Sequence, residues 1–226
     1  MKFQACIFNP NLSGSAGGTT ASRNRGGGYF RNKAIPTNPD TVFQQAARAI
    51  LAAFSQNWRG LTQAQRDAFD AAVNNFISTD VFGVGRRKTG KNLYTSLNAN
   101  LASVGQSAIL NPPTPVAVPS AGVSSFAVSS GGGTYVVAFT DPTAAESIQI
   151  WATAPLSAGV SYAKNQYRQI DGIVGGGASP VDVAAAYTAK FGAAPIGTKV
   201  FVKMVVVDNA SGIKSTASTA FALVTA

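Results

Sequence analysis

The sequence has no histidine, a single cysteine and a single glutamate, and only 12% of its 226 residues are charged. Without histidine, neither a Ser-His-Asp triad nor a histidine-ligated metal site can form. Cys6 alone cannot make a disulfide within the chain, and its aromatic surroundings are typical of a small buried hydrophobic residue. The carboxylates nearest to each other in the second half are Asp141 and Glu146, and Asp141-Pro142 is typical of a turn after a strand. We therefore expect a protein that is not an enzyme and needs no metal or cofactor.

Long hydrophobic runs are missing as well. The apolar stretch at residues 3–8 is shorter than the core of a signal peptide and runs into Asn-Pro-Asn. No apolar run reaches the 18 residues that a membrane-spanning helix needs. We expect a chain that is made in a cytoplasm and does not contact a membrane.

Positive charge is concentrated in one half of the chain. Residues 1–112 contain 12 Lys and Arg and 4 Asp, whereas residues 113–226 contain 6 basic and 5 acidic residues. This asymmetry indicates two parts with different roles, of which the first faces an anionic partner. Charge alone does not distinguish an acidic protein surface from nucleic acid or anionic lipid.

The first 34 residues predict a glycine-rich arm followed by a basic β-hairpin. Residues 2–8 favour a short strand, and residues 9–18 favour a loop or arm. Segments 19–25 and 29–34 flank Gly26-Gly27-Gly28, which predicts the turn of the hairpin. Like charges this dense on a ribbon repel each other unless an acidic partner covers them. The residues of the hairpin that we expect to bind a partner are Arg23, Arg25, Tyr29, Phe30, Arg31 and Lys33.

Residues 35–110 predict a docking domain of three helices. Asn38 and Pro39 are typical of a helix start, and Thr62 with Gln65 forms a capping-box pattern before a second helix. Helical spacing of apolar residues marks one face of each helix: Phe43, Ala47, Ile50, Phe54 and Trp58, then Phe69, Val73 and Phe76, then Leu93, Leu97, Leu101 and Val104. A basic loop at residues 83–91 precedes the third helix and adds Arg86, Arg87, Lys88 and Lys91 to the expected partner-binding residues.

This basic loop also nearly matches a phosphate-binding P-loop. Gly85 is followed at the right spacing by Gly90-Lys91, but Asn92 replaces the Ser or Thr that would bind magnesium. No apolar strand precedes the loop either. We interpret it as a basic loop without a nucleotide site.

The sequence pattern changes from helical to β-rich after a proline-rich linker at residues 111–117. Residues 118–226 predict an antiparallel β-sandwich of the immunoglobulin or fibronectin type III kind, interrupted by one helix with Val183, Tyr187 and Phe191 on one face. Trp151 is expected to pack between the two sheets. The whole chain is thus predicted to be an α+β multidomain protein. The expected strands are residues 125–129, 135–140, 148–154, 167–174, 199–208 and 216–224.

The first half resembles a family of bacteriophage and prophage proteins. The resemblance lies in S-G-S-A-G-G at residues 13–18, R-N-R-G-G-G-Y-F-R at 23–31, P-T-N-P-D-T at 36–41, W-R-G-L-T at 58–62 and G-K-N-L-Y at 90–94. The second half is similar to the immunoglobulin-like domains that are often appended to phage virion proteins, through I-Q-I-W-A-T-A at 148–154 and P-L-S-A-G at 155–159. The resemblance implies a virion component without a catalytic motif.

The leading hypothesis is a structural protein of a bacteriophage virion, assembled in the host cytoplasm. Its basic half would dock onto neighbouring virion proteins, with a head-surface or auxiliary capsid position favoured over a tail, baseplate or fibre position. Homo-oligomers are expected because virion proteins occupy symmetric positions. The alternatives are a nucleic-acid-binding module that uses the basic hairpin and loop, and a glycan-binding adhesin that uses Trp151, Tyr162 and Tyr167.

Overall fold

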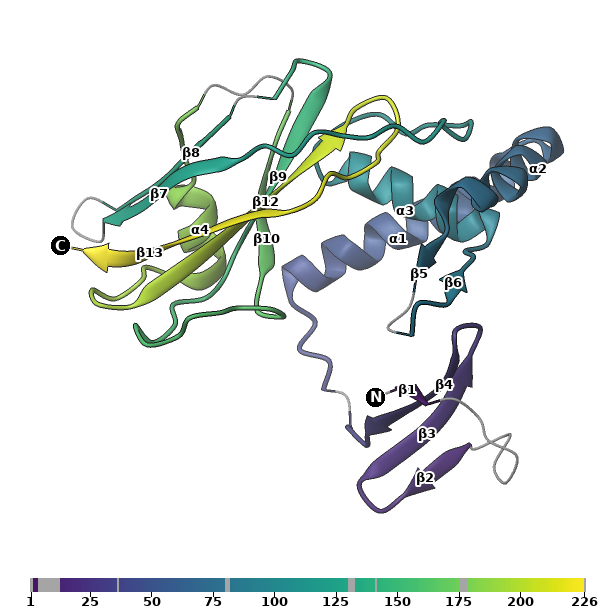
Figure 1. Cartoon of the computed structure of the whole chain (residues 1–226), viewed down its shortest axis with the longest axis horizontal. Coiled ribbons are helices and arrows are strands. Elements are labelled where there is room, and N and C mark those ends of the chain that lie inside the picture. The colour runs from purple at the N-terminus through teal and green to yellow at the C-terminus, as the bar shows by residue number, and fades with distance from the viewer. Residues whose placement is uncertain are drawn as a thin grey trace. The chain divides into compact units, whose positions relative to one another are not determined.

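The protein is an α+β chain whose described part forms four α-helices and three β-sheets (Figure 1). The computed structural model describes residues 2–3, 13–35, 37–79, 82–129, 133–140, 142–174 and 179–225. The chain divides into two compact units. Unit 1 comprises residues 1–49 and 76–88, and unit 2 comprises residues 50–75 and 89–226.

Unit 1 contains a four-stranded antiparallel sheet in the order β1-β4-β3-β2. The sequence predicted a loop or arm at residues 9–18, but Gly14 to Ala16 form a strand that pairs with residues 19–21. Gly17, at a φ of 55°, makes the tight turn between these strands. The strands are β1 (Lys2–Phe3), β2 (Gly14–Ala16), β3 (Thr19–Asn24) and β4 (Gly27–Asn32).

The predicted basic hairpin is present as β3 and β4, but its turn lies earlier than expected. Asn24 pairs with Gly27, so the two-residue turn is Arg25-Gly26, and Gly27 and Gly28 belong to β4. The side chain of Asn24 accepts a hydrogen bond from Gly26 N at 2.9 Å, which closes the turn locally. Arg25 therefore occupies the tip of the hairpin.

Helix α1 (Val42–Gly60) begins later than the sequence predicted. Asn38 and Pro39 were expected at its N-terminus, but Thr41 Oγ1 accepts from Gln44 N at 3.3 Å in the capping position. Asn38 and Asp40 instead accept hydrogen bonds from the Arg48 guanidinium at 2.6 and 3.1 Å. Unit 1 also contains a small ribbon made of β5 (Ser78–Thr79) and β6 (Gly85–Arg86).

Unit 2 begins with the second part of α1, which packs with α2 (Gln63–Ala72) and α3 (Gly90–Ala102). The predicted capping box is confirmed, because Thr62 and Gln65 exchange hydrogen bonds at the start of α2. A 3₁₀ turn (Val73–Phe76) follows α2. The shared core is aromatic: the Tyr94 ring centroid lies 6.3, 5.5 and 5.3 Å from those of Phe54, Trp58 and Phe69.

The second half of the chain forms one curled, mixed seven-stranded sheet in the order β10-β9-β12-β13-β7-β8-β11. All six predicted strands are present, but the predicted two-sheet sandwich is not confirmed. A short parallel pairing, Val224 with Val128 and Thr225 with Ser129, joins the two sides into one sheet. The strands are β7 (Val123–Ser129), β8 (Thr134–Phe139), β9 (Glu146–Ala152), β10 (Arg168–Ile173), β11 (Val181–Asp182), β12 (Lys199–Asp208) and β13 (Ser218–Thr225).

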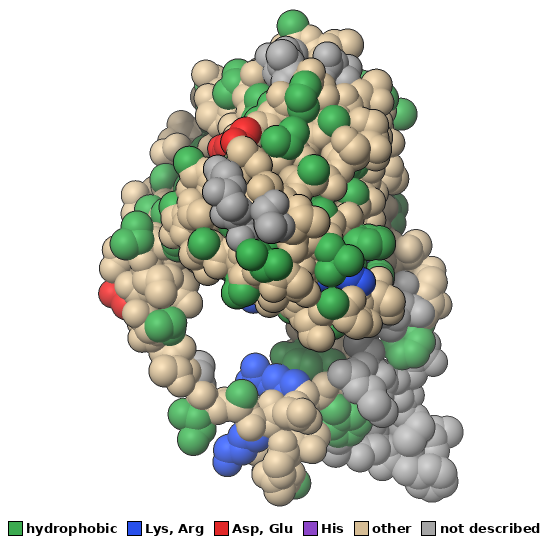
Figure 2. All heavy atoms as spheres, turned by 90° about the vertical axis from the view of Figure 1, so that its left-hand side faces the viewer, with side chains coloured by type: hydrophobic (Ala, Val, Ile, Leu, Met, Phe, Trp, Pro, Cys, Tyr) green, Lys and Arg blue, Asp and Glu red, His purple; other side chains and the backbone are tan. Residues whose placement is uncertain are grey.

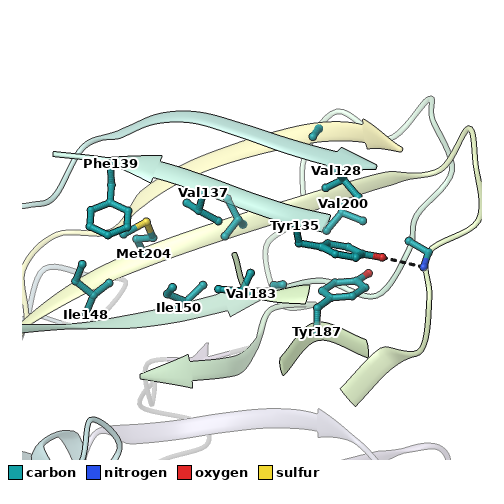
Figure 3. Close-up of a cluster of buried hydrophobic side chains, with 14 of the residues drawn as sticks. Val128, Tyr135, Val137, Phe139, Ile148, Ile150, Val183, Tyr187, Val200 and Met204 are labelled. Carbon is teal, nitrogen blue, oxygen red and sulfur yellow. Dashed lines mark hydrogen bonds between the residues drawn. The ribbon is translucent and has the colours of Figure 1, made fainter. Parts of the chain in front are cut away.

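The curl encloses the main hydrophobic core, in which side chains of β7 and β8 face those of β9 and β12 (Figure 3). Helix α4 (Ala184–Phe191), whose predicted stripe of Val183, Tyr187 and Phe191 packs into this core, closes one end. The Tyr187 ring stacks on that of Tyr135 with centroids 4.3 Å apart. The Tyr135 hydroxyl in turn accepts a hydrogen bond from Ala194 N at 3.0 Å (Figure 3).

Helix α3 packs against the outer face of the curled sheet. Leu101 and Val104 form a small cluster with Val207 of β12. Gly172 and Gly212 permit this close approach: a β-carbon on either residue would lie 2.5 Å from a carbonyl oxygen of the helix region, Ser103 O or Leu97 O. The helical and β parts of unit 2 therefore share a packed interface as well as the 111–117 connection.

Trp151 lies on this outer face and not in the core, contrary to the prediction. Ile148, Ile150 and Ala152 of β9 point inward, and alternation along the strand sends Trp151 to the opposite side. There the Lys203 ammonium lies 4.5 Å from its ring centroid.

Charged side chains are sparse on the side of unit 2 that Figure 2 shows. In Figure 2 the visible face of the curled sheet shows hydrophobic side chains scattered among uncharged polar ones and few acidic or basic groups. Within the described part of the chain, no helix combines the length and the hydropathy that a membrane span requires.

Candidate interaction site

Unit 1 brings together the two basic segments that the sequence predicted as partner-binding. The Arg86 guanidinium on β6 lies against Gly26 in the hairpin turn and occupies the space that a β-carbon at position 26 would need. Arg25 is exposed at the same turn, and Arg87 and Lys88 are exposed directly after β6. We call Arg23, Arg25, Arg86, Arg87 and Lys88 the basic tip.

The remaining predicted hairpin residues are divided between the two faces of the sheet. Phe30 pairs with buried Ala21 and shares the face of Arg23, whereas Tyr29 and Arg31 point to the opposite face. Lys33 is exposed just beyond the end of β4. The six residues predicted on the hairpin therefore do not form a single patch.

Lys91 belongs to the first turn of α3 and therefore to unit 2. The N-terminus of this helix is already satisfied within the chain. Thr89 Oγ1 accepts from Asn92 N at 3.2 Å, and the Asp70 carboxylate accepts from Gly90 N at 2.9 Å. A carboxylate at this position occupies the amide that a phosphate would bind and repels an anion.

Unit 1 buries very little of its own apolar surface. Among its described residues only Ala21 is buried. Large apolar side chains of the unit that remain about half exposed or more are Ile35, Val42, Phe43, Ile77, Phe82 and Val84, at 90, 77, 51, 53, 49 and 54%. Exposed apolar surface is a common feature of interaction sites, which makes this surface a candidate.

The charges of unit 1 are almost all of one sign. Its described residues contain the basic tip together with Arg31, Lys33 and Arg48, against one acidic residue, Asp40. The Asp40 carboxylate is 3.1 Å from the Arg48 guanidinium, in a pair that is more than half exposed. Asp40 is thus the one acidic residue among the described residues of unit 1, and its carboxylate pairs with Arg48.

A second candidate surface lies on the outer face of the curled sheet. It is a groove of about 420 Å³ lined by residues of β12, β13 and the 161–167 segment, and we call it the outer groove. Tyr162 and Tyr167, two of the three aromatics predicted for glycan binding, line it, and Trp151 lies next to it beneath Lys203. Tyr162 is 71% exposed.

Apart from Tyr162 and Tyr167, the residues that line the outer groove were missed from the sequence, among them Phe201, Lys203 and Phe221. The signal that could have revealed them is strand alternation, because Val200, Val202 and Met204 point into the core and the odd-numbered residues of β12 must point outward. Similarly, Ala222 and Val224 of β13 point inward and Phe221 points outward.

The carboxylate considered for catalysis has a structural role. Glu146 is buried, and its Oε2 accepts from Thr143 N and Oγ1 at 3.0 and 3.1 Å, closing the turn before β9. Asp141 and Cys6 lie outside the described residues. The described part of the chain contains no group of three His, Cys, Asp or Glu side chains able to hold a metal ion.

Two surfaces of the chain thus have the features of binding sites, the basic and apolar surface of unit 1 and the outer groove of unit 2. No family model, no curated protein and no solved structure matches this chain.

Proposed function

We propose that the protein is a non-enzymatic assembly protein of a bacteriophage particle, in which unit 1 docks onto neighbouring virion proteins. The observation that carries the proposal is the surface of unit 1, where one described residue is buried while six large apolar side chains and a basic tip are exposed. Such a unit gains most of its stabilisation when a partner covers it, because burial of apolar area is the main favourable contribution to folding.

The partner that fits this surface is an acidic protein face. A surface that contains both exposed apolar residues and arginines matches the composition of protein interfaces, where Arg and aromatic residues are enriched. A nucleic acid would use the basic tip but would leave Ile35, Val42 and Phe82 exposed. The apolar share of the surface therefore favours a protein partner.

Unit 2 would be the part that tiles or projects from the particle. We infer that its curled sheet is a variant of the immunoglobulin-like sandwich, since side chains of β7 and β8 face those of β9 and β12 across one core. Its weakly charged surface suits contacts with copies of itself, and a head-surface position is favoured over a tail position.

The test uses the full chain in particles purified from a host that carries the gene. Arg86→Glu/Arg87→Glu reverses two charges of the basic tip, and Arg59→Glu/Arg168→Glu reverses two exposed charges in unit 2 as a matched control. We expect incorporation into particles, measured by quantitative mass spectrometry, to fall at least about tenfold for the first variant only. Normal incorporation of the first variant would overturn the docking role.

A filter-binding titration separates this proposal from the nucleic-acid alternative. Retention of DNA or RNA that drops about a thousandfold or more between about 50 and 200 mM salt would indicate a phosphate-binding surface with several contacts. We expect no such retention.

A further inference from the structure

The outer groove is built by strand alternation and by a segment that folds over the sheet. Leu156 bridges to Lys199, and the Lys199 ammonium donates to Val160 O at 2.8 Å. Buried Ala163 anchors the same segment. These contacts hold residues 156–163 against β12 and make them one wall of the groove, so the groove exists without a ligand.

Aromatic rings stay exposed along the groove. Phe221 is 57% and Tyr162 71% exposed. The ring centroid of Phe221 lies 5.6 Å from that of buried Phe201, and this contact helps to position the Phe221 ring. The face of an aromatic ring is electron-rich and attracts partly positive C–H groups. The apolar face of a sugar ring presents such C–H groups in one plane.

Positive charge lines the groove. The Lys203 ammonium lies 4.5 and 5.0 Å from the ring centroids of Trp151 and Tyr167, and burial lowers its pKa. Lys164 is exposed at the rim. No acidic residue is among the described residues that line the groove.

Hydroxyl groups complete the lining. Ser161, Tyr162 and Thr219 are among the lining residues, and their hydroxyls make no hydrogen bond with the described part of the chain. A ligand rich in hydroxyl groups can therefore donate to and accept from them. The volume of about 420 Å³ lies in the range of small-molecule sites and accommodates one or two sugar rings.

We propose that the outer groove binds an acidic saccharide, a sugar whose carboxylate meets Lys203 and Lys164 while its ring stacks on Tyr162 and Phe221. A sugar phosphate or nucleotide fits less well, because the lining offers no arginine fork and no helix N-terminus for a phosphate. The site lies in unit 2 and does not depend on the docking of unit 1.

The experiment is calorimetric titration of the full chain with trigalacturonate and, for comparison, with the neutral trimer of galactose. We expect saturable binding of the acidic trimer, at least about tenfold tighter than of the neutral one and weaker at high salt. Tyr162→Ala and Phe221→Ala should each weaken it about fivefold or more. Leu223→Ala is the matched control, since Leu223 is an exposed apolar residue of β13 that does not line the groove.

Several outcomes would overturn the proposal. Equal affinity for the two trimers would show that charge does not contribute to binding. Unchanged binding by Tyr162→Ala or Phe221→Ala would show that the saccharide does not bind in the outer groove. Tighter binding of glucose 6-phosphate or of a hexaglutamate peptide than of trigalacturonate would assign the groove to a phosphate or to an acidic protein segment instead. Circular dichroism of each variant confirms that the chain is folded.

Discussion

The guanidinium of Arg86 lies against the backbone of Gly26, and this contact joins two basic segments that are 60 positions apart in the chain. Gly26 accepts this neighbour because it has no side chain. The contact positions Arg86 beside Arg25 at the turn of the hairpin, and it makes a basic tip from residues that the sequence alone leaves separate.

Gly26→Ala is expected to displace Arg86 and to weaken partner binding with little loss of stability. The colliding atoms are the far end of a flexible side chain, which can move away at low cost. We expect the free energy of unfolding to change by less than about 0.5 kcal/mol, while incorporation into particles falls severalfold. Gly18→Ala is the control, because a β-carbon there meets nothing within 4 Å. Equal behaviour of the two variants in the incorporation assay would contradict the role of the contact.

Gly172→Ala is expected to destabilise unit 2. A β-carbon at position 172 would lie 2.5 Å from Ser103 O and 3.2 Å from Val104 Cα, which are backbone atoms that cannot turn away. The helix end must shift, at a cost of about 1–3 kcal/mol. Urea unfolding followed by tryptophan fluorescence measures this change. Gly159→Ala should leave the midpoint unchanged, since nothing lies within 4 Å of its β-carbon position.

Asn98→Ala should also destabilise unit 2, because Asn98 is fully buried and ties residue 109 back to α3. Its Oδ1 accepts from Ile109 N at 2.7 Å, and its Nδ2 donates to Tyr94 O and Ile109 O at 3.1 and 3.2 Å. Removing the amide leaves the Ile109 backbone groups without this partner, and we expect a loss of about 2–3 kcal/mol. Thermal unfolding checks this, with Asn57→Ala, an exposed residue of α1, as the control. If Asn98→Ala lost no more stability than the control, the hydrogen bonds of Asn98 to Ile109 would not contribute to the stability of unit 2.

Alkaline pH is expected to destabilise unit 2 through Tyr187. Burial, and then the nearby Tyr135, raise the pKa of Tyr187 far above 10. The folded chain therefore keeps a proton that the unfolded chain releases, so this stabilisation is complete below about pH 10 and is lost as the pH rises above it.

The measurement is the urea midpoint of the wild type and of Tyr187→Phe between pH 7 and 11. The variant loses the bond from the Tyr187 hydroxyl to Thr153 O and should be about 1 kcal/mol less stable at pH 7. Above pH 10 its stability should decline less steeply. Tyr162 is exposed, so Tyr162→Phe should show the same pH dependence as the wild type. If the stability of Tyr187→Phe fell with pH as steeply as that of the wild type, Tyr187 would not be the group responsible.

The sequence by itself determined most of the local structure. The capping box at Thr62, the β3–β4 hairpin and all six predicted strands of the second half are present, because caps, turns and alternation depend on residues close together in the chain. The composition alone excludes histidine-based chemistry, because the chain contains no histidine.

Only the tertiary structure decided which of these elements meet. A short parallel pairing joins β13 to β7 and turns an expected sandwich into one curled sheet, and no local pattern specifies a partner strand nearly 100 residues away. Folding of the chain places the Lys203 ammonium over the Trp151 ring and the Arg86 guanidinium against Gly26. Contacts between distant segments depend on the packing of the whole chain, and both candidate binding surfaces consist of such contacts.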